Sequence, residues 1–451
     1  MKNKEIEKRI DLLNNFDMKK KNIKIKDKSA TIYFTSSLVD KMDIIYLMEY
    51  LDKLKSIKDL DLLIYNGEIK KETNIDTIIE ELYAGFLVLY INDETIYLID
   101  AKSYPNRSIE EPLTEKTIRG SRDGFSESIN TNIGLIRRRL KTTDLVAKPF
   151  LVSEKSKTSV AVVYLKNEVD QRLIKRIEDE LRNIDVESLI MSDRSLEELL
   201  FKQKYTPFPL VRYTERPDVA SISIMHGKIA ILVDTSASVI ITPITLFDHT
   251  MHVEEFRQSP LVGTFTRLIR GIAILLSLFL IPLWMCIIDN SEIMNALKIT
   301  ISNENIELGI AIQIIIVELI LEIVRLASIH TPTTLQTGIS LISAVILGQV
   351  SLELGLFLPE VLLLCSISQI CGFATPSYEL SMSMKLNNLI LILVVALFGK
   401  NGFIIYSLLL FLYLISLKVW SVPYLSPLCP FDSESIGSIF IRQSAENRKK
   451  L

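Results

Sequence analysis

Charged residues are distributed very unevenly along this chain of 451 residues. Asp, Glu, Lys and Arg occupy 83 of the first 267 positions but only 22 of the last 184. A long segment with so few charges is typical of a membrane region, and the mean hydropathy of +0.29 agrees with this. The chain therefore divides near residue 268 into a charged N-terminal region and an apolar C-terminal region.

Composition and motifs exclude several classes of protein. The 51 basic and 54 acidic residues nearly cancel, whereas a nucleic-acid binder needs a clear cationic excess. The four cysteines have no CxxC spacing, so we expect buried free thiols, and neither a metal nor a cofactor. Motifs of hydrolases, P-loop proteins and dinucleotide-binding enzymes are missing, so we expect no enzyme and no catalytic residues. The opening MKNKEIEKRIDLLNN lacks the apolar core of a signal peptide, which predicts a cytoplasmic N-terminal region.

The first 267 residues predict two small α/β units followed by a β-hairpin. Short apolar runs alternate with helical periods, which is the pattern of strands packed against helices. In the first unit, after a mobile or partly helical lead-in over 1–28, we expect strands at 29–35, 60–65, 86–91 and 95–102 and helices at 38–56 and 75–84. In the second we expect helices at 125–140, 168–182 and 195–203, strands at 148–153, 159–165 and 186–190, and a hairpin of 228–234 with 238–243.

The apolar part predicts an all-α membrane bundle of four to six helices, since a crossing needs about 20 mostly apolar residues. The last candidate contains Gly399-Lys400-Asn401-Gly402 and fits either one long tilted helix or a hairpin of two short ones. The five candidates are 271–288, 306–324, 337–358, 361–375 and 389–417. The predicted domains are 1–118 and 119–267 (the two α/β subdomains, the second with the hairpin), 268–420 (the membrane bundle) and 421–451 (a cytoplasmic tail).

Basic residues predict the orientation of the bundle. Arg267 and Arg270 precede the first candidate span, and the tail ends in Arg448-Lys449-Lys450. Because basic flanks are retained inside, both termini are expected in the cytoplasm, with an even number of crossings.

The segment 306–325 carries the most informative side chains. At about 100° per residue, Glu307, Glu318, Glu322 and Arg325 share one narrow stripe of an otherwise apolar helix. Ionisable groups in a bilayer are costly and usually face a bundle interior or a water-filled path. An ion pathway is slightly favoured, because Arg325 neutralises only one of three acids, and a ring of subunits would form acidic rings that select cations. The alternatives are an interfacial amphipathic helix, or a Glu322–Arg325 pair that only locks helices together.

The following span adds two further groups of candidate residues. Gln349 and Glu353 are four residues apart, and we include them in the ion pathway, although Glu353 also fits a position near the outer interface. Small residues four apart predict a face for close helix packing; they are Ser340, Ala344 and Gly348.

Five blocks, in order along residues 119–432, resemble the signatures of the GerA family of spore germination receptor A-subunits. The blocks are RGSRDGFSESINTNIGLIRRRLK (119–141), YTERPDVAS (213–221), HGKIAILVD (226–234), FATPSYELS (373–381) and VPYLSPLCPFD (422–432). Further stretches, such as VDTSASVIITP (233–243) and FRQSPLVG (256–263), are similar to the stage V sporulation protein AF branch, although Ala237 stands where Pro is typical. Residues 1–118 carry no such block.

The resemblance implies a multi-pass protein of the inner spore membrane with both termini in the spore core. It also implies assembly into a homo-oligomeric channel that releases monovalent cations during germination, with small membrane proteins as partners and no nucleic acid. Two alternatives stay open: the A-subunit of a germinant receptor that senses small nutrients, or a non-conducting scaffold. A secondary transporter is disfavoured, because we see no inverted repeat.

Overall fold

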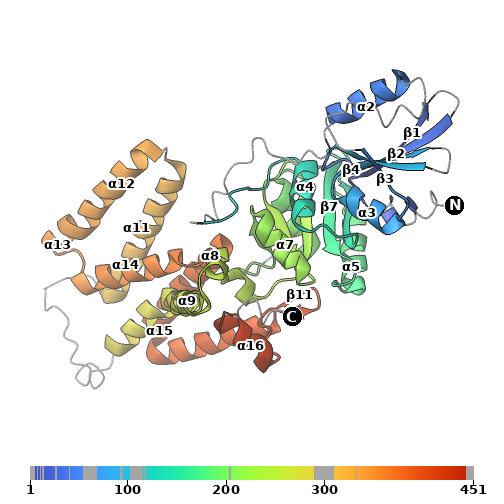
Figure 1. The fold of residues 1–451 in the computed structure, drawn as a ribbon. Helices are drawn as coiled ribbons and strands as arrows, with labels where there is room; N and C mark the ends of the chain where they lie inside the picture. Colours follow the sequence, from blue (N-terminus) through green and yellow to red (C-terminus); the bar gives the residue numbers. More distant parts are fainter. Residues whose placement is uncertain are drawn as a thin grey trace.

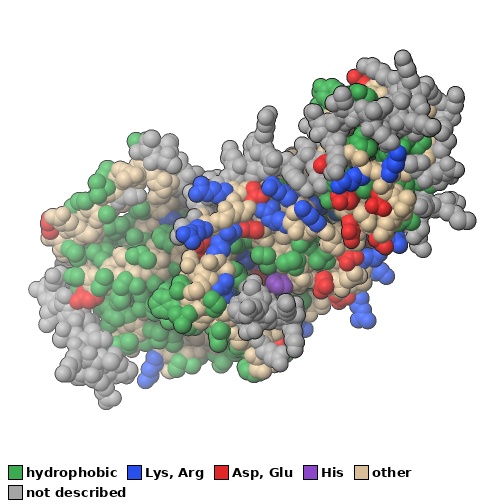
Figure 2. Space-filling model, in the orientation of Figure 1, with side chains coloured by type: hydrophobic (Ala, Val, Ile, Leu, Met, Phe, Trp, Pro, Cys, Tyr) green, Lys and Arg blue, Asp and Glu red, His purple; other side chains and the backbone are tan. Residues whose placement is uncertain are grey.

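The computed structural model describes residues 6–7, 9–10, 12, 15–25, 28–39, 41–53, 69–91, 95–101, 115, 117, 119–202, 205–288, 309–331 and 333–442. In Figure 1, two α/β units lie at one end of the molecule and the long helices at the other. Figure 2 shows hydrophobic side chains covering much of the helical end, whereas Lys, Arg, Asp and Glu gather over the α/β end. The predicted fold class, an α/β region followed by a helical membrane bundle, is confirmed.

The first unit is an antiparallel five-stranded sheet in the order β1-β2-β4-β5-β3. Helix α2 packs on one face and α3 on the other. All six residues of β4 are buried, because helices cover both faces of the sheet. The elements are β1 (Met18–Ile25), β2 (Lys28–Thr35), α2 (Lys41–Lys53), β3 (Ile69–Lys71), α3 (Ile75–Tyr83), β4 (Phe86–Ile91) and β5 (Thr95–Asp100).

The predicted lead-in over 1–28 is only partly correct: residues 6–7 and 9–10 are helical, but its C-terminal part is a strand. Residues 18–25 form the edge strand β1, paired with β2 along its whole length from Met18 opposite Thr35 to Ile25 opposite Lys28. The sequence of β1, MKKKNIKI, shows little apolar periodicity because the lysines are exposed on an edge, where charges hinder pairing with other chains. The strand predicted at 60–65 lies outside the described residues.

The second unit is also an antiparallel five-stranded sheet, in the order β6-β7-β9-β10-β8. Helices α5 and α6 cover one face, and α4 and α7 cover the other. The predicted hairpin, β9–β10, lies within this sheet and is not a separate element. The elements are α4 (Ile129–Arg139), β6 (Leu145–Val152), β7 (Thr158–Leu165), α5 (Gln171–Arg182), α6 (Ser192–Phe201), β8 (Arg212–Thr214), α7 (Pro217–Met225), β9 (Ile229–Val233) and β10 (Val239–Thr242).

The strand predicted at 186–190 is wrong. This segment is irregular and joins α5 to α6. Its backbone carbonyls at Val186 and Glu187 accept hydrogen bonds from the N–H groups of Glu154 and Lys155, at 3.1 and 2.9 Å. A short apolar run packed beside a loop resembles a strand in sequence, because periodicity does not show which backbone groups pair.

A buried ion pair joins the two units. Arg137 of α4 donates to both carboxylate oxygens of Asp17, at 2.5 and 2.7 Å, and the two side chains are 1% and 0% exposed. Burial alone raises the pKa of Asp17, but the charge and hydrogen bonds of Arg137 outweigh it and hold that pKa below its usual value. The guanidinium also lies 5.0 Å from the ring centroid of Tyr83 in α3. The lead-in therefore attaches the first unit to the second.

The helical end follows two short helices, η2 (Leu246–His249) and α8 (Val253–Arg257). Three helical stretches in the described part of the chain have the length and apolar composition of a membrane span: Pro260–Ile288, Leu335–Glu353 and Tyr378–Ser416. Helix α11 has 21 residues but carries three charged side chains. The elements are α9 (Pro260–Ile288), α11 (Ile310–His330), α12 (Thr333–Val345), η3 (Ile346–Val350), α13 (Ser351–Glu353), α14 (Pro359–Phe373), α15 (Tyr378–Ser416), β11 (Lys418–Val419), β12 (Val422–Pro423) and α16 (Ser433–Phe440).

Helix α15 is a hairpin of two antiparallel arms, which decides between the two predictions for this segment. Gly399 has non-helical dihedral angles, φ 58° and ψ −145°, and so breaks the helix. The Tyr406 hydroxyl donates to Asn387 Oδ1 at 2.9 Å, although these residues would lie about 28 Å apart along a straight helix. Exposed Lys400 follows the break at once, so it lies at the tip of the hairpin.

The second α/β unit and the membrane helices share one apolar core. The cluster around α4 and α7 continues into Ile274 and Leu278 of α9 and into both arms of α15. Trp420, after the second arm, donates from Nε1 to Thr242 Oγ1 of β10 at 3.1 Å. The independent folding of residues 1–267 stays a prediction, and its test is whether that piece, expressed alone, is soluble and folded despite the loss of this shared core.

The C-terminal tail lies beside the start of α9. Arg267 donates to the Ile439 carbonyl at 2.8 Å, and the Arg442 N–H donates to Thr264 Oγ1 at 3.0 Å. Arg267 also pairs with the buried carboxylate of Glu255 at 2.8 Å. The tail therefore lies at the same end of the bundle as the α/β units.

We predict that Gly402→Val lowers the abundance of the protein in membranes. A Cβ at position 402 would lie 2.7 Å from the Val394 carbonyl oxygen and 2.9 Å from Phe398 Cβ, which forces the hairpin arms apart. Such overpacking costs about 1–3 kcal/mol. Gly271→Val in α9 is the matched control, because no atom lies within 4 Å of its added Cβ. Equal abundance of the two variants, measured by immunoblot, would contradict the close approach.

Candidate functional site

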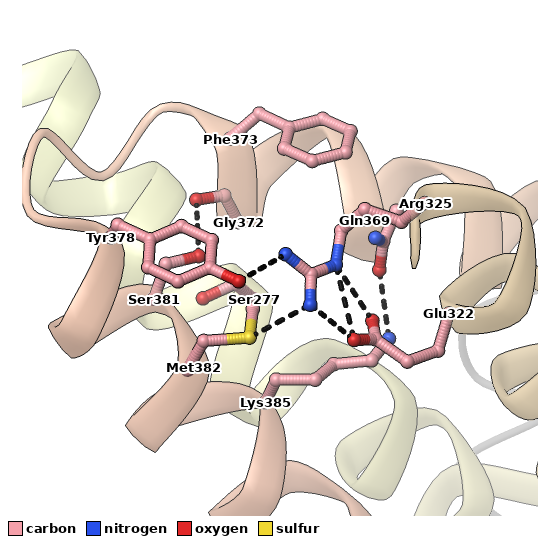
Figure 3. Close-up of a pocket in the computed structure, with 10 residues that line it drawn as sticks. All are labelled: Ser277, Glu322, Arg325, Gln369, Gly372, Phe373, Tyr378, Ser381, Met382 and Lys385. Carbon is pink, nitrogen blue, oxygen red and sulfur yellow. Dashed lines mark hydrogen bonds and ion pairs between the residues drawn. The ribbon is translucent and has the colours of Figure 1, made fainter. Parts of the chain in front are cut away.

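Charged side chains from two helices, α11 and α15, meet inside the helical bundle. Glu318, Glu322 and Arg325 lie on one face of α11, because they are four and three residues apart. The first arm of α15 brings Lys385 to this face, and α14 brings Gln369. The cluster lies where two helices and the start of the hairpin converge (Figure 3).

Glu318 is fully buried and ion-paired. Its side chain is 0% exposed, and Lys385 Nζ contacts its Oε2 atom. Lys385 also donates to Gln369 Oε1 at 2.8 Å. A carboxylate withdrawn from water needs such a partner, because an unpaired buried charge costs several kcal/mol. This pair therefore ties α11 to α15.

Glu322 and Arg325 form a second pair beside the first. Arg325 Nε lies 3.1 Å from both carboxylate oxygens of Glu322, and Nη1 donates to the Tyr378 hydroxyl at 3.2 Å. Nη2 lies 2.9 Å from Met382 Sδ. Two carboxylates and two cations therefore make the cluster electrically neutral.

A cavity of about 250 Å³ opens beside these pairs. Figure 3 shows the Arg325 guanidinium in direct contact with the Glu322 carboxylate, with Tyr378 and Lys385 alongside. Ser277 of α9 and Gln369 of α14 add polar groups to its wall. A cavity of this size has room for several waters or a small hydrated ion, and the charged side chains on its wall supply polar partners.

The structure brings only part of the predicted ion pathway together. Glu318, Glu322 and Arg325 meet as expected, whereas Glu307 lies outside the described residues. Gln349 and Glu353 contact each other, Nε2 to Oε1 at 3.0 Å, on an exposed surface of η3 and α13 away from the cluster. Sequence reasoning counted Arg325 as the only cation near the three acids and missed Lys385 and Gln369. The available signal was that Lys385 is the one Lys or Arg between residues 326 and 399.

Among the residues that the structure describes, nothing packs on the predicted small-residue face at Ala344 or Gly348. Ala344 is exposed, and nothing lies within 4 Å of a Cβ built on Gly348. Ser340 lies in the same helix, α12. The role of this face in helix packing therefore stays a prediction.

The α/β end meets the loop between α14 and α15 through a buried histidine. His249 Nδ1 lies 3.0 Å from Ser377 Oγ, and Ser377 Oγ donates to Glu379 Oε2 at 2.9 Å. Burial, followed by the positive charge of Arg212, lowers the pKa of His249 to about 3. His249 therefore stays neutral across the physiological range and holds the loop by a hydrogen bond.

An α/β region joined to three helical stretches that are long and apolar enough to cross a bilayer is typical of a multi-pass membrane protein. The family described as Bacillus/Clostridium GerA spore germination protein matches residues 4–451. The chain belongs to the GerA family.

Relatives refine this assignment. The chain is 39% identical to the stage V sporulation protein AF of Bacillus subtilis, over 98% of this chain and 92% of that one. It is 28% identical to spore germination protein KA of Bacillus subtilis (83% and 70%) and 30% identical to spore germination protein XA of Bacillus anthracis (83% and 78%). The N-terminal domain of the A subunit of the Bacillus megaterium spore germinant receptor GerK3 matches at 25% identity and a TM-score of 0.40, over 53% of this chain and 92% of that chain. The resemblance to the family and to its stage V sporulation protein AF branch is confirmed.

We predict that Lys385→Met strongly lowers stability, by about 3–5 kcal/mol, because it leaves the buried Glu318 carboxylate unpaired. Glu318→Gln in the same chain should restore most of the loss, because it removes the orphaned charge. A double-mutant cycle on detergent unfolding or membrane abundance measures the coupling. Additive losses would show that the two side chains do not interact.

We predict that His249 reduces stability in acid. The folded protein holds this side chain neutral down to about pH 3, whereas an unfolded histidine takes up a proton near 6.5, so stability falls as the pH falls through this window. The slope approaches about 1.4 kcal/mol per pH unit below the upper limit. His249→Gln should therefore become more stable relative to the parent between pH 6.5 and 4, in thermal unfolding of the full chain. Parallel curves for the two proteins would contradict the burial of a neutral His249.

Proposed function

We propose that this chain is a subunit of a homo-oligomeric membrane channel that releases monovalent cations across the inner spore membrane during germination. The supporting observation is the cavity of about 250 Å³ bordered by Glu322, Arg325 and Lys385 among membrane helices. Ionisable groups at such a place usually line the route of an ion or a proton. The relatives named as sporulation and germination proteins supply the setting.

The neutral cluster corresponds to a closed state of this channel. Each carboxylate is held by a cation of the same chain, Glu318 by Lys385 and Glu322 by Arg325. A passing cation has to compete with these partners, so conduction requires that at least one pair separates. The proposed pathway thus includes Glu318, Glu322 and Arg325, with Lys385 and Gln369 added.

The open surface of α12 and α13 supports assembly. Leu341, Ile342 and Val345 are at least 46% exposed, and they lie next to the small-residue face of Ala344 and Gly348. Small residues let two helices approach closely in lipid, so a second copy is the proposed neighbour on this face. Small membrane proteins of the germination apparatus are further proposed partners.

Both termini are proposed to face the spore core. The contacts of Arg267 with Ile439, and of Arg442 with Thr264, bring the tail to the α/β end of the bundle. Basic residues at this end of the bundle agree with its retention on the inner side of the membrane. The proposed number of crossings is therefore even, with the two arms of α15 counted separately.

A scaffold without conduction is the second candidate. It is favoured by the complete pairing of Glu318 and Glu322, because paired charges also serve to lock helices together. We propose that the chain has no catalytic activity. The remaining alternative is that it is the subunit of a receptor for small nutrients.

The double variant Glu318→Gln, Lys385→Met separates channel from scaffold, because it removes both charges of one pair together. For a channel, we expect cation flux from germinating spores, or conductance of the purified protein, to change at least about fivefold, equivalent to about 1 kcal/mol on the barrier. Membrane abundance is measured in parallel. Normal flux and selectivity at normal abundance would remove this pair from the pathway and favour the scaffold.

Single variants distinguish an effect on assembly from an effect on ion flux per molecule. Glu322→Gln should reduce assembly more than flux per molecule, because it leaves Arg325 without its main carboxylate partner in low dielectric. Gln349→Ala is the matched control, because this residue is exposed and lies away from the cluster. A change in flux per molecule for this control alone would place the pathway along η3 and α13.

A further inference from the structure

A second cavity lies at the junction of the α/β end with the membrane helices. Its volume is about 530 Å³. One wall consists of residues of α6 and β8, including Asp193 and Tyr213. The other consists of the end of α14, the loop that follows it and the start of α15, from Gly372 to Ser381. We call it the junction cavity, and the cavity of Figure 3 the membrane cavity.

The two cavities share a wall. Gly372, Phe373, Tyr378 and Ser381 line both. Of these, Tyr378 is fixed by the charged cluster, since its hydroxyl accepts from Arg325 at 3.2 Å and the Arg325 guanidinium lies 5.5 Å from its ring centroid. Tyr378 thus lines the junction cavity and also contacts Arg325 of the Glu322–Arg325 pair, a contact that Figure 3 shows.

The junction cavity suits a cation. Its lining carries four carboxylates and two guanidinium groups, and both arginines already have carboxylate partners. Arg212 pairs with Glu115 at 3.0 Å, and Arg194 pairs with Glu197 at 2.5 Å. Asp193 and Glu379 then make the remaining lining charge negative.

The junction cavity also contains a hydroxyl oxygen that is available to a bound water or ion. Thr375 lines the junction cavity and is only 8% exposed, and its Oγ1 has no hydrogen-bond partner among the residues that the structure describes. A buried hydroxyl without a protein partner is expected to bind a water or an ion.

We infer that the junction cavity is the spore-core entrance of the ion path, where hydrated monovalent cations gather, and that Tyr378 closes it from the membrane cavity. This inference rests on the proposed function. Movement of Tyr378 away from the wall breaks its contact with Arg325 and joins the two cavities. Because that contact also helps to hold Arg325 on Glu322, opening the entrance loosens one of the pairs that keep the cluster closed.

Thiol accessibility tests this barrier without relying on conduction. The full chain, with its four native cysteines replaced by alanine, carries one reporter cysteine and is held in inverted membrane vesicles whose outer face bears the α/β end. Ser277→Cys reports on the membrane cavity, and Ser238→Cys reports on the junction cavity. A membrane-impermeant, positively charged methanethiosulfonate reagent is added outside.

We expect the Ser238→Cys reporter to react readily in every background. The Ser277→Cys reporter should react slowly beside Tyr378 and at least about tenfold faster with Tyr378→Ala, because a barrier that is seldom open becomes permanently open. Phe411→Ala is the matched control: it removes an exposed aromatic ring from the second arm of α15 that lines neither cavity. It should leave the rate unchanged.

Two results would overturn the inference: an unchanged Ser277→Cys rate with Tyr378→Ala at normal abundance, or a rate already equal to that of Ser238→Cys beside intact Tyr378. If Tyr378→Ala does not accumulate, Tyr378→Phe replaces it. This variant keeps the ring but loses the hydroxyl contact with Arg325, so the rate should still rise, and an unchanged rate again overturns the barrier.

Flux measurements on the same variants separate this inference from the proposed function. If the protein conducts but Tyr378→Ala leaves the Ser277→Cys modification rate unchanged, the proposed channel is supported and the proposed barrier is wrong. If Tyr378→Ala speeds the modification of Ser277→Cys but the protein never conducts, Tyr378 is a structural barrier only. The junction cavity is then not an ion entrance, and the inference is wrong.

Discussion

Charges removed from water in this protein are held in pairs, and several partners come from distant parts of the chain. Asp17 and Arg137 are 120 residues apart, and Glu318 and Lys385 are 67 apart. Each carboxylate is 0% exposed. Breaking such a pair leaves an uncompensated charge in low dielectric, which is far more costly than losing a surface contact. The first pair fixes one α/β unit to the other, and the second fixes α11 to α15.

Helix α15 links the membrane cluster to the α/β end. Its first arm carries both Lys385 and Tyr378, and the loop before it is held by His249 through Ser377. The second arm continues into Trp420, which is bonded to β10. Because the apolar core is continuous across this junction, a shift of the second α/β unit has to be accommodated by the hairpin. Helix α15 therefore connects the α/β end physically to the side chains that line the membrane cavity.

The fold was predictable wherever hydrophobic periodicity reports burial. Strand β4, FLVLYI, and the alternating runs of the second sheet were identified because helices cover both faces. Periodicity failed for β1, an edge strand rich in lysine, and for 186–190, an apolar run that pairs with no strand. In both cases the outcome depends on which backbone groups find partners, and a local pattern does not record this.

The sequence by itself determined that the chain divides near residue 268, that the second part is helical and apolar, and that Glu318, Glu322 and Arg325 share a helix face. These properties depend on composition and on the helical repeat, which are local. Only the tertiary structure decided that α15 folds back at Gly399 and that Lys385 neutralises Glu318. It also decided that Tyr378 lines two cavities. A residue's partner across the bundle depends on how helices pack in three dimensions, and the one-dimensional repeat carries no information about that distance.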